Sequence, residues 1–164
     1  MTYSFTINTD ASHDPTTRTA GWACWIKSTH YKIQDSGLFP EPVPNSSVAE
    51  LMAIEQALLR LDNLIWSQDF LRDQMTGSGI ILYINTDSKW SIMALQGQVK
   101  RSKHLAIARR IRSLTEGYII DPRHVKSHTR KKDARSVNDW CDKAAKRHVR
   151  RRLKEINDRS KQEI

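Results

Sequence analysis

Apolar and polar residues alternate along the first third of the chain, which is the pattern of strands with one buried face. The stretch "YSFTINT" alternates up to Asp10, and "AGWACWIKS" places Trp22, Cys24 and Ile26 on one face. A third stretch, "HYKIQDSGLF", runs into the Pro-rich "FPEPVPN", and the connections between the three are short. Because short connections are typical of antiparallel neighbours, we predict an antiparallel three-stranded meander.

The spacing of apolar residues then changes from two to between three and four. In "SSVAELMAIEQALLRLDNL" the apolar positions are Val48, Leu51, Ile54, Leu58 and Leu61. This spacing predicts an amphipathic helix, and "IWSQDFLRDQMTGSG" after it predicts one or two further helical turns. The near-continuous apolar run "IILYINT" is typical of a strand that is covered on both faces.

The second half of the chain alternates between helical and strand patterns. "SKWSIMALQ" and "KHLAIARRIRSLTEG" predict helices, and the second should end at Gly117. "YIIDPRHVK" predicts a fifth strand, which Pro122 favours as an edge strand. The basic loop "SHTRKKDARS" precedes a last helix that should begin at about Asn138. The apolar face of this helix would consist of Cys141, Ala145, Val149 and Leu153.

These elements predict an α/β fold, a five-stranded mixed sheet flanked by helices. Three antiparallel strands come first, and two more are reached through helices, so these two should lie parallel to their neighbours by right-handed crossovers. The 164 residues suffice for one core, and no repeat or linker divides them. We therefore expect one domain over residues 1–164, with a basic helix and tail from about residue 138.

Charge is distributed unevenly between the two halves of the chain. The net charge is +9, but residues 1–99 carry 6 Lys and Arg against 10 Asp and Glu, whereas residues 100–164 carry 21 against 8. The basic residues of the second half fall in three clusters, at 100–112, 123–135 and 143–154. One cluster is usually a solvated helix face, but three indicate a polyanionic partner, either nucleic acid or an anionic membrane surface.

The apolar runs are of strand length, and the N-terminus lacks a basic flank followed by an apolar signal core. The two cysteines, Cys24 and Cys141, are too few for a metal–thiolate site, and we expect them to be reduced and packed in the core. We therefore expect a cytoplasmic, monomeric protein that does not associate with membranes.

Two segments, "YSFTINTDAS" and "IILYINTDSK", share the letters INTD, and in each an apolar strand ends at an aspartate, Asp10 or Asp87. If the two strands are parallel neighbours, both carboxylates lie at the edge where open α/β sheets bind ligands. Asp87 could instead cap the helix after it, but no helix follows Asp10. Glu50 could form a capping box with Ser47, and Asp142 could stabilise the first turn of the last helix.

The joint order of these motifs resembles the type I ribonuclease H family, over about residues 3–145. The matching segments are "TDAS", "AELMAIEQAL", "YINTDS" and "NDWCDKAA". The resemblance implies that the catalytic, metal-binding carboxylates are Asp10, Glu50, Asp87 and Asp142. The segment "HVKSH" matches the family's loop histidine, which implies a catalytic role for His128.

The resemblance further implies an endonuclease that hydrolyses the RNA strand of RNA/DNA hybrids, with 5′-phosphate and 3′-hydroxyl ends. Its cofactor would be Mg²⁺, two ions, with Mn²⁺ as a possible substitute. Carboxylate oxygens are the ligands that Mg²⁺ prefers, and two cations about 4 Å apart can hold both the attacking and the leaving oxygen. His128 would transfer a proton at the leaving group or assist product departure.

Candidate contacts to the hybrid are polar side chains near the acids, because RNA is distinguished from DNA by its 2′-hydroxyl. These candidates are Ser12, Asn45, Ser46, Ser47, Ser88, Lys126 and Asn138. Ser46 and Ser47 fit helix capping equally well, and Asn138 could also be a cap.

One departure from the family pattern concerns the segment that binds the duplex. Bacterial members carry a basic, Trp-rich protrusion before the fifth strand, which here is absent or reduced to "QGQVKRSKH". The basic C-terminal helix, with Arg150, Arg151 and Arg152, is a candidate replacement that would bind phosphates.

Two other functions fit parts of the sequence. The same scaffold serves DNA and junction nucleases, and the basic C-terminal residues would equally suit a non-catalytic nucleic-acid-binding module. A complete set of acids favours an enzyme, because clustered carboxylates repel a phosphate unless a cation lies between them.

Overall fold

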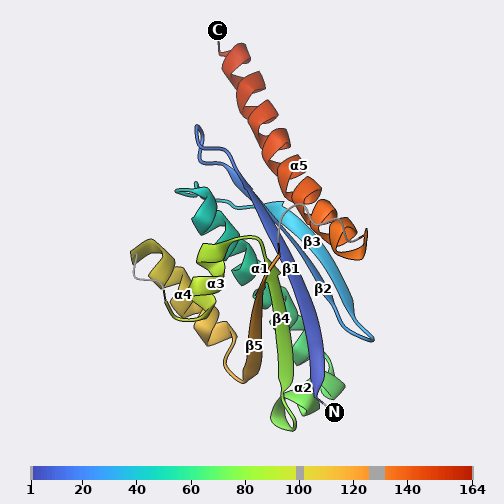
Figure 1. The fold of residues 1–164 in the computed structure, drawn as a ribbon. Coiled ribbons are helices and arrows are strands. Elements are labelled where there is room, and N and C mark those ends of the chain that lie inside the picture. Colours follow the sequence, from blue (N-terminus) through green and yellow to red (C-terminus); the bar gives the residue numbers. More distant parts are fainter. Residues whose placement is uncertain (1, 99–101, 126–131, 164) are drawn as a thin grey trace.

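The structure, a computed structural model, describes residues 2–98, 102–125 and 132–163 and contains one five-stranded sheet (Figure 1). The strands are β1 (Tyr3–His13), β2 (Ala20–Lys27), β3 (Lys32–Leu38), β4 (Ile80–Thr86) and β5 (Tyr118–His124). Their order across the sheet is β3-β2-β1-β4-β5. The first three are antiparallel, and β4 lies parallel to both β1 and β5, so the predicted mixed sheet is confirmed, with Pro122 on an edge strand.

Helices connect the parallel strands and cover the sheet. They are α1 (Ser46–Ser67), α2 (Asp69–Thr76), α3 (Lys89–Leu95), α4 (Ser102–Leu114) and α5 (Lys132–Gln162). Each predicted crossover contains two helices, α1 and α2 before β4, and α3 and α4 before β5. Among the described residues, no helix combines the length and the apolar character needed to cross a membrane.

The last helix begins at Lys132, so the prediction of a start at about Asn138 was wrong. Most residues of the predicted loop "SHTRKKDARS" from Lys132 onward are good helix formers, which allows the helix to extend in that direction. Asp142 consequently lies in the third turn of α5. Its role as a macrodipole-stabilising residue of the first turn no longer applies.

The main core lies between the sheet and α1. Alternate residues of β1 are buried on this face, as the two-residue spacing predicted. Alternate residues of β4 are buried too, but the residues between them are only half-buried, so the prediction of a strand fully covered on both faces was wrong. The buried residues pack against the apolar stripe of α1, where Leu51, Ile54 and Leu61 are inaccessible to solvent. The position of α1 over β1 brings the first turns of this helix next to the end of that strand.

The other face of the sheet is covered by α5 through small side chains. Cys141, Ala144 and Ala145 of α5 pack on Ala23 of β2, and both Cys24 and Cys141 are buried and free, as predicted. The helix comes so close to β2 that a Cβ at Gly21 would lie only 2.7 Å from the carbonyl oxygen of Ala145. Glycine at this position therefore sets the height of α5 above the sheet.

Candidate active site

The two INTD segments lie side by side and in register on the parallel strands β1 and β4. Asn8 pairs with Asn85, whose Nδ2 donates a hydrogen bond of 3.1 Å to Asn8 Oδ1. β4 ends one residue beyond this pair, at Thr86, whereas β1 continues through Asp10 to His13 alongside β2. The prediction that the first strand ends at Asp10 was therefore wrong. Asp10 and Asp87 therefore occupy equivalent places, each two residues past the last pair, at the same open edge of the sheet.

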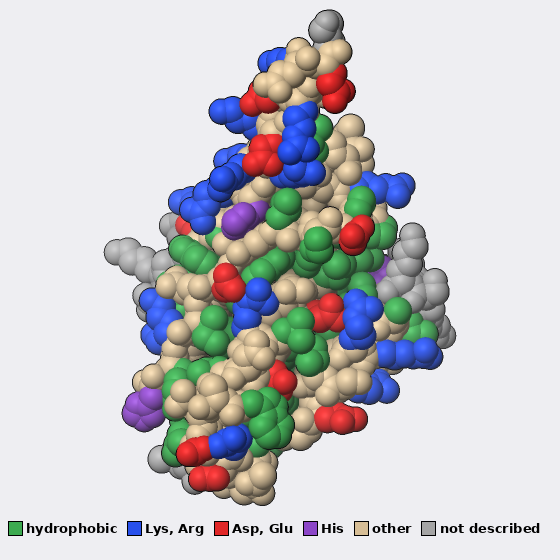
Figure 2. Space-filling model, turned by 180° about the vertical axis from the view of Figure 1, so that it is seen from behind, with side chains coloured by type: hydrophobic (Ala, Val, Ile, Leu, Met, Phe, Trp, Pro, Cys, Tyr) green, Lys and Arg blue, Asp and Glu red, His purple; other side chains and the backbone are tan. Residues whose placement is uncertain are grey.

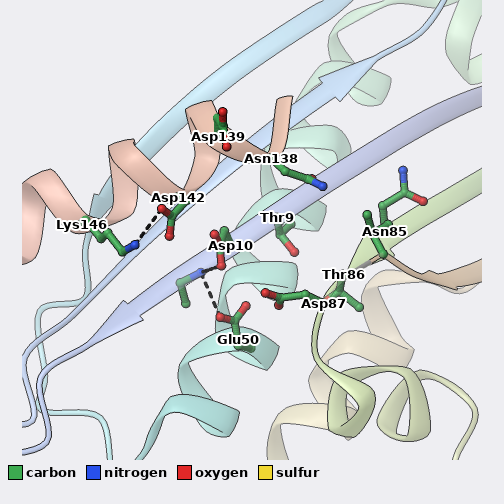
Figure 3. Close-up of a pocket in the computed structure, with 12 residues that line it drawn as sticks. Thr9, Asp10, Glu50, Asn85, Thr86, Asp87, Asn138, Asp139, Asp142 and Lys146 are labelled. Carbon is green, nitrogen blue, oxygen red and sulfur yellow. Dashed lines mark hydrogen bonds and ion pairs between the residues drawn. The ribbon is translucent and has the colours of Figure 1, made fainter. Parts of the chain in front are cut away.

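A pocket of about 300 Å³ opens at this edge, between β1, β4, α1 and α5 (Figure 3). Asp10, Glu50 and Asp87 each offer one carboxylate oxygen within 4.8 Å of the others. Asp142 reaches the same pocket from α5. The structure thus brings together the four carboxylates that the sequence singled out. The other lining residues are Thr9, Ala11, Asn85, Thr86, Val125, Asn138, Asp139 and Lys146.

Glu50 points into the pocket and does not cap its helix. The N-cap of α1 is Asn45, whose Oδ1 accepts a hydrogen bond of 2.9 Å from the Val48 amide. Glu50 Oε1 accepts a bond of 3.3 Å from the Ala11 amide, while Oε2 is buried and has no hydrogen-bond partner in the described part of the chain. The capping box with Ser47 is therefore wrong, and so is capping by the serines before Glu50.

Asp87 is likewise not a helix cap. Ser88 Oγ accepts a hydrogen bond of 3.2 Å from the Ser91 amide and so caps α3. The backbone carbonyl of Asp87 lies 3.0 Å from His124 Nε2. This contact ties the end of β4 to the end of β5 and leaves the Asp87 side chain directed into the pocket (Figure 3).

Burial and mutual repulsion raise the pKa of three of these carboxyl groups. For Asp10, burial and then the charges of Asp87 and Asp142 raise the pKa to about 7. For Glu50, burial and then the charge of Asp10 raise the pKa well above its ordinary value. Asp87 is more exposed, yet the partial burial of its carboxyl group raises its pKa as well. Such a cluster is strained electrostatically unless protons or cations neutralise it.

Asp142 is held differently from the other three carboxylates. Its Oδ2 lies 2.8 Å from Lys146 Nζ, one turn further along α5 (Figure 3). Sequence reasoning missed this lysine, although the i, i+4 spacing of an acid and a lysine on a predicted helix was a usable signal. Lys146 therefore places a positive charge beside the acids of the pocket.

The other residues predicted to contact the substrate lie partly in the pocket and partly outside it. Asn138 lines the pocket, whereas Asn45 and Ser88 use their side chains as helix caps. Ser46 and Ser47 lie in the first turn of α1, and Ser12 lies on β1 opposite Gly21 of β2. His128 and Lys126 lie outside the described residues.

Solved structures share the fold of this chain, although no protein-family model and no curated protein matches the sequence. The N-terminal RNase H domain of a Mycobacterium tuberculosis protein is similar with a TM-score of 0.67 at 15% identity, over 94% of this chain and 99% of that chain. The protein has the ribonuclease H fold. RNase H1 from Halobacterium salinarum has the same fold, with a TM-score of 0.64 at 17% identity, over 89% of this chain and 97% of that one.

A third structure with the ribonuclease H fold was solved with nucleic acid. LC11-RNase H1, isolated from compost and crystallised with an RNA/DNA hybrid, has a TM-score of 0.62 at 19% identity. The similarity covers 91% of this chain and 99% of that chain. The fold predicted from the motifs is thereby confirmed.

The raised pKa values predict that the metal-free protein loses stability as the pH rises. The folded chain holds the Asp10 proton more tightly than the unfolded chain, so the free energy of unfolding should fall between pH 3.8 and about pH 7. In EDTA at pH 8, the Asp10→Asn variant should melt at a higher temperature than the wild type. The rise in the pKa of Asp10 from 3.8 to about 7 corresponds to about 4 kcal/mol, which in a chain of this size is a difference in Tm of roughly 8–16 °C. At pH 4 the two should melt together, and Mg²⁺ should raise only the wild-type midpoint strongly.

Thermal melts at both pH values measure this prediction. The difference between the two proteins reports Asp10 together with the carboxyl groups whose pKa its charge raises, above all Glu50, and cancels the titrating groups elsewhere in the chain. A difference that is constant with pH, or a wild type that is more stable than the variant in EDTA at pH 8, would contradict it.

Proposed function

We propose that the protein is a divalent-metal-dependent endonuclease that hydrolyses the RNA strand of RNA/DNA hybrids and leaves 5′-phosphate and 3′-hydroxyl ends. The observation that carries the proposal is the cluster of Asp10, Glu50 and Asp87 oxygens at the end of the paired INTD strands. The ribonuclease H fold, shared with an RNase H1 crystallised with such a hybrid, supports this substrate.

The chemistry of the pocket fits hard divalent cations, with Mg²⁺ as the proposed ion and Mn²⁺ as a substitute. All donors of the cluster are carboxylate oxygens, the ligands that Mg²⁺ prefers. The buried Glu50 Oε2 has no partner among the described residues, and a bound cation would satisfy it. Two such cations, when bound, supply the positive charge that stabilises the attacking and leaving oxygens of a phosphodiester.

The two sides of the pocket would then have different tasks. Asp10, Glu50 and Asp87 are preorganised, since the sheet register and α1 hold them within 4.8 Å of one another. Asp142 would help to hold a second cation, in competition with its ion pair to Lys146. The freed ammonium could then contact the phosphate that enters the pocket.

Residues around the pocket would bind the hybrid. We propose Asn138 as a contact, because it lines the pocket from α5. Contacts to the hybrid stay predictions for Ser12, Ser46, Ser47 and Lys126, and also for Asn45 and Ser88 in addition to their capping role. Proton transfer by His128 stays a prediction as well. That the protein is a cytoplasmic monomer also remains a prediction.

Cleavage of a panel of labelled duplexes tests the proposal. RNA/DNA hybrid, double-stranded RNA, double-stranded DNA and a four-way junction are incubated with Mg²⁺ and with EDTA. We expect Mg²⁺-dependent cleavage of the RNA strand of the hybrid, and 3′-hydroxyl ends that a polymerase can extend. Preferential cleavage of the junction or of DNA would replace the proposed substrate, and binding of the hybrid without any cleavage would indicate a binding module.

A further inference from the structure

The outer face of α5 carries a row of basic residues that the pocket does not use. Lys143, Arg147, Arg150, Lys154 and Lys161, called here the basic stripe, follow one another at intervals of four, three, four and seven residues. At 3.6 residues per turn these intervals place all five on one side of the helix. All five are exposed, opposite the buried Cys141, Ala145 and Val149.

The basic stripe extends beyond the body of the protein. Val149 is the last buried residue of α5 among those described, and the helix continues to Gln162. Figure 1 shows this part projecting past the sheet, and Figure 2 shows Lys and Arg side chains gathered along it. The 13 residues from Arg150 to Gln162 span about 20 Å at 1.5 Å per residue.

Ion pairs separate the stripe from three other basic residues of α5. Arg151 and Arg152 reach Glu155 at 3.8 and 3.4 Å, and Lys146 is paired with Asp142. Of the three arginines that the sequence offered as phosphate contacts, only Arg150 is therefore kept, and Arg151 and Arg152 are not. Within the described part of the chain, no acid lies in ion-pair distance of a stripe residue. From Lys143 to Gln162 the helix holds nine Lys and Arg against two Asp and Glu.

The stripe is unfavourable for an isolated helix. Three successive pairs of like charges stand three or four residues apart, and each costs roughly 0.2–0.5 kcal/mol. A polyanion alongside the helix would remove this repulsion and release its own counterions. A membrane surface fits less well, since the stripe face carries no exposed apolar residue that could enter the lipid boundary.

We infer that the basic stripe binds the phosphates of the nucleic acid duplex outside the cleavage site, a contact that rests on the proposed function. Lys143 follows Asp142 directly, so the stripe starts at the rim of the carboxylate pocket and leads away from it. The stripe contacts one side of a duplex that enters the pocket. Because it contacts phosphates only, it does not distinguish one base sequence from another. Only a duplex long enough to run along α5 engages it.

Binding of long and short hybrids measures the contribution of the stripe. Asp10→Asn is the common background, so that no RNA is cut, and Kd is measured by fluorescence anisotropy over a range of salt concentrations. The test variant adds Arg147→Gln, Arg150→Gln and Lys154→Gln. The charge-matched control adds Arg151→Gln, Arg152→Gln and Arg159→Gln, which lie off the stripe on the same helix.

We expect the stripe variant to bind a hybrid of about 20 base pairs roughly 10- to 100-fold more weakly at low salt, with a salt slope lower by about 2–3. The control should change Kd by less than about threefold, and a hybrid of about 8 base pairs should bind both variants alike. Helix content by circular dichroism confirms that both triple variants fold.

Three results would overturn the stripe contact. They are unchanged binding of the long hybrid, an equal loss in both triple variants, and a loss seen with anionic phosphatidylserine vesicles but not with the hybrid. Because binding is measured without cleavage, these results are independent of the proposed activity. The proposed activity is tested separately, by cleavage of the duplex panel with the wild type.

Discussion

Replacing Asp10 with asparagine is expected to reduce the rate of hybrid cleavage by more than about 100-fold. Even the replacement of a residue that only hydrogen-bonds to a metal ligand typically reduces metal affinity or activity 10- to 100-fold. Asparagine keeps the size and the hydrogen bond of 2.9 Å that Asp10 Oδ1 accepts from the Ala11 amide. It removes the negative charge at the centre of the cluster with Glu50 and Asp87. Single-turnover cleavage of labelled hybrid in saturating Mg²⁺ measures the effect.

The matched control for this substitution is Asp139→Asn. Asp139 lines the same pocket and lies on α5, but it is exposed and stands outside the cluster of close carboxylate oxygens. Its replacement should leave the cleavage rate nearly unchanged. Equal losses in the two variants would mean that general negative charge, rather than the cluster, supports cleavage.

Adding one methyl group at Gly21 is expected to lower both stability and activity. The new Cβ would stand 2.7 Å from the Ala145 carbonyl oxygen and 3.3 Å from Val149 Cγ2, so α5 must move away from β2. Overpacking of this kind costs about 1–3 kcal/mol, which corresponds to a fall in Tm of roughly 3–10 °C. Because α5 carries Asp142, cleavage well below the new Tm should fall as well.

Gly77→Ala provides the comparison for Gly21→Ala. Gly77 follows α2, away from α5, and has φ of −94° and ψ of −106°, a backbone conformation outside the usual α and β regions. A Cβ there would lie 3.2 Å from the Asp73 carbonyl oxygen, so Gly77→Ala should lower stability without displacing α5. Differential scanning calorimetry and hybrid cleavage are measured on both variants. If Gly21→Ala is as active as Gly77→Ala when both are assayed well below their Tm values, the contact between α5 and β2 does not position Asp142.

Most of the fold could be predicted from the sequence because the apolar spacing changes sharply between strands and helices. Trp22, Cys24 and Ile26 of β2 are buried on one face, and the spacing along α1 matches its buried stripe. The start of α5 could not be predicted in this way. Its basic first turns carry no apolar pattern, and a run of Lys and Arg is compatible with both a loop and a helix.

The carboxylates were predictable for a different reason. Asp10 and Asp87 follow similar apolar segments, and the parallel pairing of these segments places both aspartates just past the last β1–β4 pair, although β1 itself continues to His13. Local sequence favoured capping for Glu50, and only the structure shows that Asn45 caps α1 and frees Glu50 to face the pocket. The pair of Asp142 and Lys146 depends on where α5 lies above the sheet, which a sequence pattern does not specify.

Anomalous scattering from a crystal soaked in Mn²⁺ tests the central claim most directly, since it locates the cation without relying on activity. We predict a peak in the anomalous difference map among the carboxylates of Asp10, Glu50 and Asp87, the three groups whose oxygens lie within 4.8 Å of one another. The peak should disappear in crystals of the Asp10→Asn variant. Ordered Mn²⁺ elsewhere in the molecule, with no peak among these three carboxylates, would contradict the proposed metal site.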